Sequence, residues 1–296
     1  MFRSNTPEGT SLKVKFGVHL PPEGLTFTQM REACLAAERQ GYDLFTMTDH
    51  FYPMRETSKG YPLECWSTLA GLAAVTERIK LGPLVSCVWY RNPTLLGKIA
   101  TTVDIISNGR LILGIGAGWH ESEFKAYYGL YPTIKEREDA LEETAQILRS
   151  MLHKRETTFV GKRYRVENLI NLPPPIQAAI PIMVGGGGER RTLRTAAKYG
   201  DISHFFANNA EEVERKIRVL KEHCRKSRRD SSEVSIGTSL TPIVDGGHLS
   251  SQSRDYIEAC VGLGVSIFTI RFSPLGSIAM EIQREFADEI IPSFHA

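Results

Sequence analysis

The sequence has few cysteines, and their spacing matches no metal or disulfide motif. The 296 residues include five cysteines, an odd number, with no Cys-x-x-Cys pair among them. Zinc sites and disulfide frameworks use paired, closely spaced cysteines, so neither is expected here. Scattered thiols instead fit a protein that stays in a reducing cytoplasm. The five positions are Cys34, Cys65, Cys87, Cys224 and Cys260.

Long apolar runs and a charge excess are also missing. No stretch approaches the roughly 20 apolar residues of a membrane span. Residues 1–13 are polar, whereas a signal peptide would have an apolar centre. The formal net charge is only +2, which gives no reason to expect nucleic acid or an anionic membrane as a partner. The sequence therefore predicts a soluble, cytoplasmic protein.

What the chain does contain is a regular alternation of strand-like and helix-like segments. Eight strand patterns occur, and each is followed by a helical pattern. No Pro/Ser/Gly-rich spacer divides the chain, so we expect one domain over residues 1–296. The count and the length favour an α/β fold of the (β/α)₈ or TIM-barrel type over an open doubly wound sheet. The expected strands are 14–20, 43–48, 79–88, 111–117, 182–184, 202–206, 234–244 and 266–271.

One insertion interrupts this alternation between the fourth helix and the fifth strand, at residues 153–177. It contains two short alternating runs around Gly161, within residues 157–165, which is typical of a β-hairpin. Three prolines at positions 173–175 then stiffen the return to the barrel.

Two strand-like segments end in glycines directly before a helical segment. The first is Leu111-Ile-Leu-Gly-Ile-Gly-Ala-Gly-Trp119, and the second is Pro181-Ile-Met-Val-Gly-Gly-Gly-Gly188. Bare backbone N–H groups at a helix N-terminus suit the binding of a phosphate. One such junction is explained equally well by a tight turn, but two at the ends of neighbouring strands suggest a shared anionic cofactor.

Several segments together resemble the bacterial luciferase-like monooxygenases and their deazaflavin-dependent relatives. They are Glu38–Pro53 with Asp49-His50-Phe51, Leu81–Pro93, Asp104–Arg110, Gly114–Trp119 and Val184–Leu193. The resemblance covers nearly the whole chain in the right order. It implies a TIM barrel, a flavin-type ring at the C-terminal mouth of the barrel, hydride chemistry at that ring, and a homodimer.

The resemblance leaves two cofactors open. Members of the family use either reduced FMN, which activates dioxygen, or coenzyme F420, a 5-deazaflavin that exchanges hydride. Asp49-His50-Phe51 is similar to the motif of the F420 users, whereas the flavin monooxygenases more often carry Glu-His-His. We therefore expect an F420-dependent oxidoreductase acting on a small organic molecule. The alternatives are an FMN-dependent monooxygenase and a non-catalytic flavin-binding barrel.

The residues expected to do the chemistry follow barrel strands two and three. His50 is the first catalytic candidate, because a histidine side chain gains and loses protons near neutral pH, which suits proton transfer beside the ring. Ser86 is the second catalytic candidate, because its hydroxyl could reach the ring or the substrate. Asp49 is expected to contact the cofactor. Leu84 and Val85 match the place where F420-binding relatives carry a non-prolyl cis peptide behind the ring.

The remaining candidates form the expected cradle for the cofactor's phosphate and ribityl chain. For each glycine the plain alternative is turn sterics, and for Trp119 it is packing, but four successive glycines exceed what one turn needs. His19, His204, Arg271 and Glu123 are assigned no catalytic role, and Glu123 is expected to be a capping or pairing group. The cradle residues are Ala117, Gly118, Trp119, Gly185, Gly186, Gly187 and Gly188.

Overall fold

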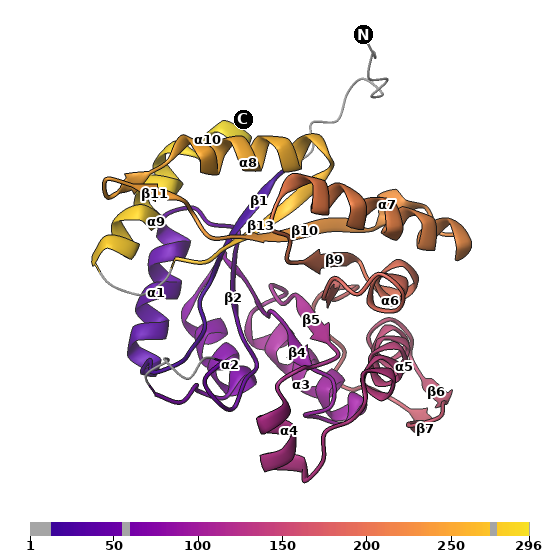
Figure 1. Ribbon diagram of the computed structural model, residues 1–296. Helices are drawn as coiled ribbons and strands as arrows, with labels where there is room; N and C mark the ends of the chain where they lie inside the picture. The colour runs from indigo at the N-terminus through magenta and orange to yellow at the C-terminus, as the bar shows by residue number, and fades with distance from the viewer. Residues whose placement is uncertain (1–12, 55–59, 273–276, 296) are drawn as a thin grey trace.

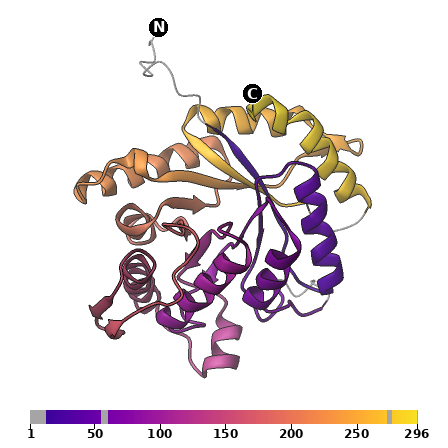
Figure 2. The ribbon, with the colours of Figure 1, turned by 180° about the vertical axis from the view of Figure 1, so that it is seen from behind.

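The computed structural model describes residues 13–54, 60–272 and 277–295, and in them a nearly closed parallel barrel is surrounded by helices. Figures 1 and 2 show the strands gathered at the centre and the helices around the outside from both sides. The sheet has nine strands in the order β3-β2-β1-β13-β10-β9-β8-β5-β4. They are β1 Lys15–His19, β2 Leu44–Met47, β3 Lys80–Pro83, β4 Ser86–Cys87, β5 Leu113–Gly116, β8 Ile182–Gly185, β9 Ile202–Phe205, β10 Ser235–Leu240 and β13 Val265–Ile270.

The expected eight-fold alternation is confirmed, because β3 and β4 are two halves of one barrel strand. They flank Leu84 and Val85, whose peptide bond is cis, as the family resemblance implies. Every pairing in the large sheet is parallel. The helices are α1 Phe27–Arg39, α2 Cys65–Val75, α3 Pro93–Ile106, α4 Glu121–Tyr128, α5 Ile134–His153, α6 Thr192–Tyr199, α7 Ala210–Lys226, α8 Ser251–Gly262, α9 Ser277–Glu289 and α10 Ile291–His295.

The insertion is also present as a hairpin. Strands β6 (Thr157–Val160) and β7 (Arg165–Leu169) pair antiparallel and lie outside the barrel beside α5 (Figure 1). The backbone N–H of Gly161 donates to the carbonyl of Tyr164 and closes the turn. Among the described residues, no helix combines the length and the apolar composition that crossing a membrane would take.

One expectation about the elements was wrong, and one helix was not expected. The strand expected over 234–244 ends at Leu240, and Val244 instead belongs to a small hairpin of β11 (Val244–Asp245) and β12 (His248–Leu249). Pro242 lacks a backbone donor and so cannot continue the ladder, while Gly246 and Gly247 take the positive φ values that the hairpin turn needs. The helix that was not expected is α4, a short helix that carries the buried Phe124 and Glu123.

Two separate apolar cores explain where a ligand can enter. The larger one lies between the sheet and the helices and contains Phe16, Phe45 and Phe268. A smaller core fills the barrel, since alternate strand residues point inward. It fills the interior of the barrel with apolar side chains. Its members are Leu44, Leu84, Ile112, Met183, Ile202 and Ile267.

Glycines allow the barrel to close at the seam between β3 and β5. A Cβ added to Gly114 would lie 2.0 Å from the carbonyl oxygen of Pro83, and one added to Gly82 would lie 2.2 Å from that of Ile112. Backbone atoms cannot move aside as a side chain can. We expect Gly114→Ala to lower the free energy of unfolding by about 1–3 kcal/mol, the usual effect of overpacking. Urea denaturation checks this value.

Gly262→Ala is the matched control, because a Cβ there meets nothing within 4 Å and the residue belongs to helix α8. It should leave the unfolding midpoint unchanged or raise it slightly, as alanine favours a helix. Equal stability of the two variants would contradict the account of the seam.

Candidate active site

A cleft opens at the C-terminal ends of the barrel strands. Its volume is about 450 Å³, within the range of pockets that hold a cofactor or a small ligand. Asp49, Val85, Gly118 and Gly186, which come from four separate strand ends, all face it. The other lining residues are His19, Thr48, His50, Met54, Leu84, Cys87, Tyr90, Gly116, Ala117, Trp119, Glu138, Gly185, Gly187, Gly188, Thr192, His204, Phe206 and Arg271.

Ser86 is the one sequence-predicted site residue that does not line this cleft. Its side chain is fully buried, and its hydroxyl donates to Asp49 Oδ2 at 2.8 Å while accepting from Trp66 Nε1 at 3.1 Å. Both contacts point the hydroxyl into the protein. In this structure Ser86 therefore holds the Asp49 carboxylate in place and does not contact the cleft.

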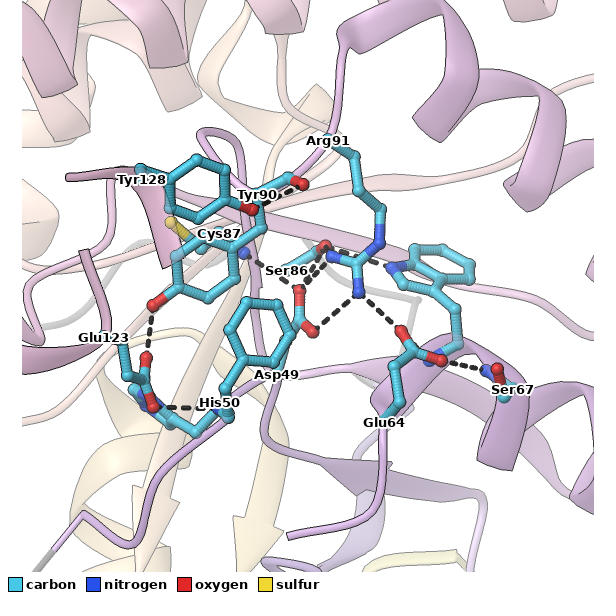
Figure 3. Close-up of polar contacts among 12 residues, drawn as sticks. Asp49, His50, Glu64, Ser67, Ser86, Cys87, Tyr90, Arg91, Glu123 and Tyr128 are labelled. Carbon is cyan, nitrogen blue, oxygen red and sulfur yellow. Dashed lines mark hydrogen bonds and ion pairs between the residues drawn. The ribbon is translucent and has the colours of Figure 1, made fainter. Parts of the chain in front are cut away.

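Asp49 lines the cleft, and its carboxylate is held in a buried network (Figure 3). Arg91 binds its carboxylate in a two-pronged ion pair, with N···O distances of 2.6 and 3.0 Å. The backbone N–H of Cys87 also donates to Oδ2. Arg91 makes a second ion pair with Glu64. Although burial alone would lower the pKa of Arg91, these two carboxylates raise it above its usual value, so Arg91 stays charged.

His50 is oriented by a buried carboxylate, that of Glu123 on α4. The Nδ1 atom of His50 lies 3.0 Å from Glu123 Oε2 and 3.1 Å from Oε1 (Figure 3). An ionised carboxylate only accepts hydrogen bonds, so Nδ1 carries a proton and donates it. Nε2 is then the nitrogen left for a ligand, and it makes no hydrogen bond to the described residues.

Glu123 is itself firmly fixed. The backbone N–H groups of Phe51 and Tyr52 donate to Oε1 at 2.9 and 2.8 Å, and the hydroxyl of Tyr90 donates to Oε2. Burial alone would raise the pKa of Glu123, but the hydrogen bonds from His50, Tyr90 and Tyr52 hold it below its usual value. The carboxylate is therefore ionised near neutral pH. Glu123 is a pairing group, as expected, but the sequence did not indicate that its partner would be His50.

The two glycine segments border the cleft where they were expected to. Gly118 and Gly186 both have positive φ, at 78° and 122°, which favours glycine. A Cβ on Gly118 would also lie 2.4 Å from the sulfur of Cys87. Gly116 and Gly185 leave room for Val85, whose side chain would lie 2.5–2.6 Å from a Cβ at either position. Val85 thus stands between the two segments at the inner wall of the cleft.

The inner end of the cleft carries two uncharged histidines. Burial, with a further contribution from the charge of Arg271, lowers the pKa of His19 to about 3. Burial likewise lowers the pKa of His204 to about 4. Their rings contact threonine hydroxyls, His19 on Thr46 and His204 on Thr269, each at 3.0 Å. Both are therefore neutral near pH 7 and act as packed polar groups.

Aromatic side chains border the outer part of the cleft. Trp119 and Phe206 are 56% and 63% exposed although both are large and apolar. The Trp119 ring lies edge-on to His50, with a centroid distance of 5.4 Å. Exposed aromatic surface at the rim of a pocket suits contact with a flat or apolar ligand.

The comparison with known protein families decides the classification. The luciferase-like monooxygenase family matches residues 8–270, which is most of the chain and includes every strand of the barrel. The chain belongs to this luciferase-like family.

Individual relatives agree with that membership. F420-dependent glucose-6-phosphate dehydrogenase of Gordonia bronchialis is 29% identical over 229 residues, 75% of this chain and 66% of the relative. The corresponding protein of Segniliparus rotundus is 31% identical over 195 residues, 64% of this chain and 56% of the relative. This luciferase-like chain therefore matches two thirds or less of the length of these curated relatives.

Solved structures share the fold of this luciferase-like protein. An F420-dependent secondary alcohol dehydrogenase, in complex with an F420-acetone adduct, superposes with a TM-score of 0.81 at 17% identity, covering 96% of this chain and 99% of the other. The coenzyme F420-dependent tetrahydromethanopterin reductase of Methanopyrus kandleri gives 0.79 at 19% identity, covering 95% and 99%. A monooxygenase of Streptomyces bottropensis also gives 0.79, at 18% identity, covering 95% and 99%.

Proposed function

We propose that this protein is an F420-dependent oxidoreductase that binds the deazaflavin in the cleft and transfers hydride to or from a small organic substrate. The observation that carries the proposal is the His50–Glu123 pair, whose histidine lines a cleft bordered by two glycine segments. The names of the curated relatives support F420 as the cofactor.

The cleft has the features that such a cofactor requires. Positions 116, 118 and 185 would each be obstructed by a Cβ, so the glycines keep the backbone close to any ligand that lies there. Leu84 and Val85 supply an apolar wall against which a planar ring can lie. Gly185–Gly188 lead into the N-terminus of α6, where backbone N–H groups favour a phosphate.

The cofactor, when bound, supplies the hydride donor or acceptor, and this chain supplies orientation and proton handling. Glu123 fixes the orientation of the His50 ring, because its ionised carboxylate lies only 3.0 Å from Nδ1. Nε2 of His50 can then hold or release a proton within the cleft. The Arg91–Asp49 ion pair anchors the segment that carries His50.

The substrate would enter at the rim, beside Trp119 and Phe206. Glucose 6-phosphate is one candidate, since the curated relatives are named for it. Two further proposals accompany this function: the protein forms a homodimer, and it works in the cytoplasm.

The runner-up function is an FMN-dependent monooxygenase of the same fold, and cofactor affinity separates the two. We expect isothermal titration calorimetry to show F420 binding at least tenfold more tightly than FMN, a difference of about 1.4 kcal/mol. The motif Asp49-His50-Phe51 and the relatives' names motivate this ranking. FMN binding as tightly as F420 would reverse it and favour the monooxygenase.

A further inference from the structure

A carboxylate lies at the end of the cleft where a phosphate would otherwise be expected. Glu138 of α5 faces the cleft and accepts a hydrogen bond from Thr192 Oγ1 at 2.6 Å. Thr192 is the first residue of α6. A Cβ added to Gly188 would lie 3.6 Å from Glu138 Oε1. The negative side chain therefore sits beside both the glycine segment and the start of this helix.

Only one of the two carboxylate oxygens of Glu138 accepts a hydrogen bond from a described residue. Its Oε2 is shielded from water and accepts no hydrogen bond within the part of the chain that the structure describes. The arginines at the start of α6 bind other carboxylates, Arg191 that of Asp139 and Arg194 that of Glu142. An incompletely paired charge away from bulk water acts strongly on nearby charges, because the local dielectric constant is low.

We propose that Glu138 is a specificity residue that disfavours a phosphomonoester at this end of the cleft. The inference rests on the proposed function, since it concerns the same cofactor cleft. A phosphomonoester, such as that of FMN, carries about −1.5 to −2 charges near pH 7. The phosphodiester of F420 carries a single charge, and the terminal hydroxyl of riboflavin carries none and can donate a hydrogen bond to a carboxylate. The more negative the group that a ligand places beside Glu138, the weaker its binding should be.

Riboflavin and FMN form the matched pair of probes, because they differ only in the phosphate. Fluorescence titration of the wild-type protein should show riboflavin binding at least as tightly as FMN. The isosteric change Glu138→Gln removes the charge and should raise the affinity for FMN relative to riboflavin by about tenfold or more. If wild type binds neither flavin, Glu138→Gln should create measurable binding of FMN.

Glu142→Gln is the control, since it removes a carboxylate one turn further along α5 that pairs with Arg194 and Lys198 and does not line the cleft. This control should leave the ratio of the affinities for FMN and riboflavin unchanged. The role of Glu138 would be overturned if Glu138→Gln left the ratio of the FMN and riboflavin affinities within twofold of wild type, or if Glu142→Gln shifted that ratio equally. It would also be overturned if wild type bound neither flavin and Glu138→Gln gained no binding of FMN.

F420, titrated in parallel, separates this proposal from the proposed function. If F420 fails to bind wild type while Glu138→Gln shifts the flavin ratio, the proposed function is wrong and the role of Glu138 stands. If F420 binds and Glu138→Gln leaves the ratio of the FMN and riboflavin affinities unchanged, the proposal for Glu138 is wrong and the proposed function stands.

Discussion

His50→Ala should lower turnover by roughly 10²-fold or more, the usual scale of a general acid–base group. Glu123 holds Nδ1 of His50, a residue that lines the cleft, so this variant removes the proposed proton-handling side chain and leaves the glycine segments in place. Cofactor affinity should fall much less than turnover, because the proposed cradle consists of backbone at Gly116–Gly118 and Gly185–Gly188. The measurement is the rate of F420 reduction with a substrate that the wild-type protein accepts, beside a calorimetric titration with F420.

A purely structural histidine would behave differently. Its loss would lower the melting temperature and leave the folded fraction fully active, so both quantities are measured on each variant. His223→Ala is the control, because that ring hydrogen-bonds to the carbonyl of Glu189 and does not line the cleft. His223→Ala should retain wild-type turnover. Wild-type turnover in a folded His50→Ala protein would remove His50 from the mechanism.

Arg91→Ala should lower the free energy of unfolding by about 3–5 kcal/mol, the typical effect of breaking a buried ion pair. The Asp49 side chain is completely inaccessible and that of Arg91 is only 10% exposed, so water cannot replace the lost partner. Asp49 would keep its hydrogen bonds from Ser86 and Cys87 but not its counter-charge. Chemical denaturation of the variant measures the loss.

Two variants sharpen this test. Arg91→Lys keeps the charge but not the two-pronged geometry, so it should fall between wild type and Arg91→Ala. Arg225→Ala breaks an exposed pair with Glu222 and should leave the melting temperature unchanged, because surface pairs contribute little. If Arg91→Ala were as stable as Arg225→Ala, the buried network would not be what holds the segment carrying His50.

The barrel and the position of its mouth could be predicted from the sequence because they depend on local signals. Eight strand patterns, each with its helix, fix the architecture. Glycines at the ends of two strands then indicate the edge where a ligand lies. The cis peptide at Leu84–Val85 followed from the family resemblance and is present. All these features can be recognised from neighbouring residues.

The partners of the site residues could not be predicted, because they are distant in sequence. Glu123 is 73 positions from His50, and Glu138 is 54 positions from Thr192. Arg91 follows the third barrel strand, yet nothing local indicates that it binds Asp49. Ser86 shows the converse limit: its position at a strand end suggested the cleft, but strand residues alternate between two faces and its hydroxyl points away from the cleft.

A crystal structure of the protein with F420 tests the central claim most directly. The account predicts the deazaflavin ring in the cleft against Leu84 and Val85, with Nε2 of His50 within hydrogen-bonding distance of the ring or of a bound substrate. The phosphate should lie along Gly185–Gly188. A ring bound outside this cleft, or inside it with His50 turned away and Nε2 beyond reach, would contradict the proposed function.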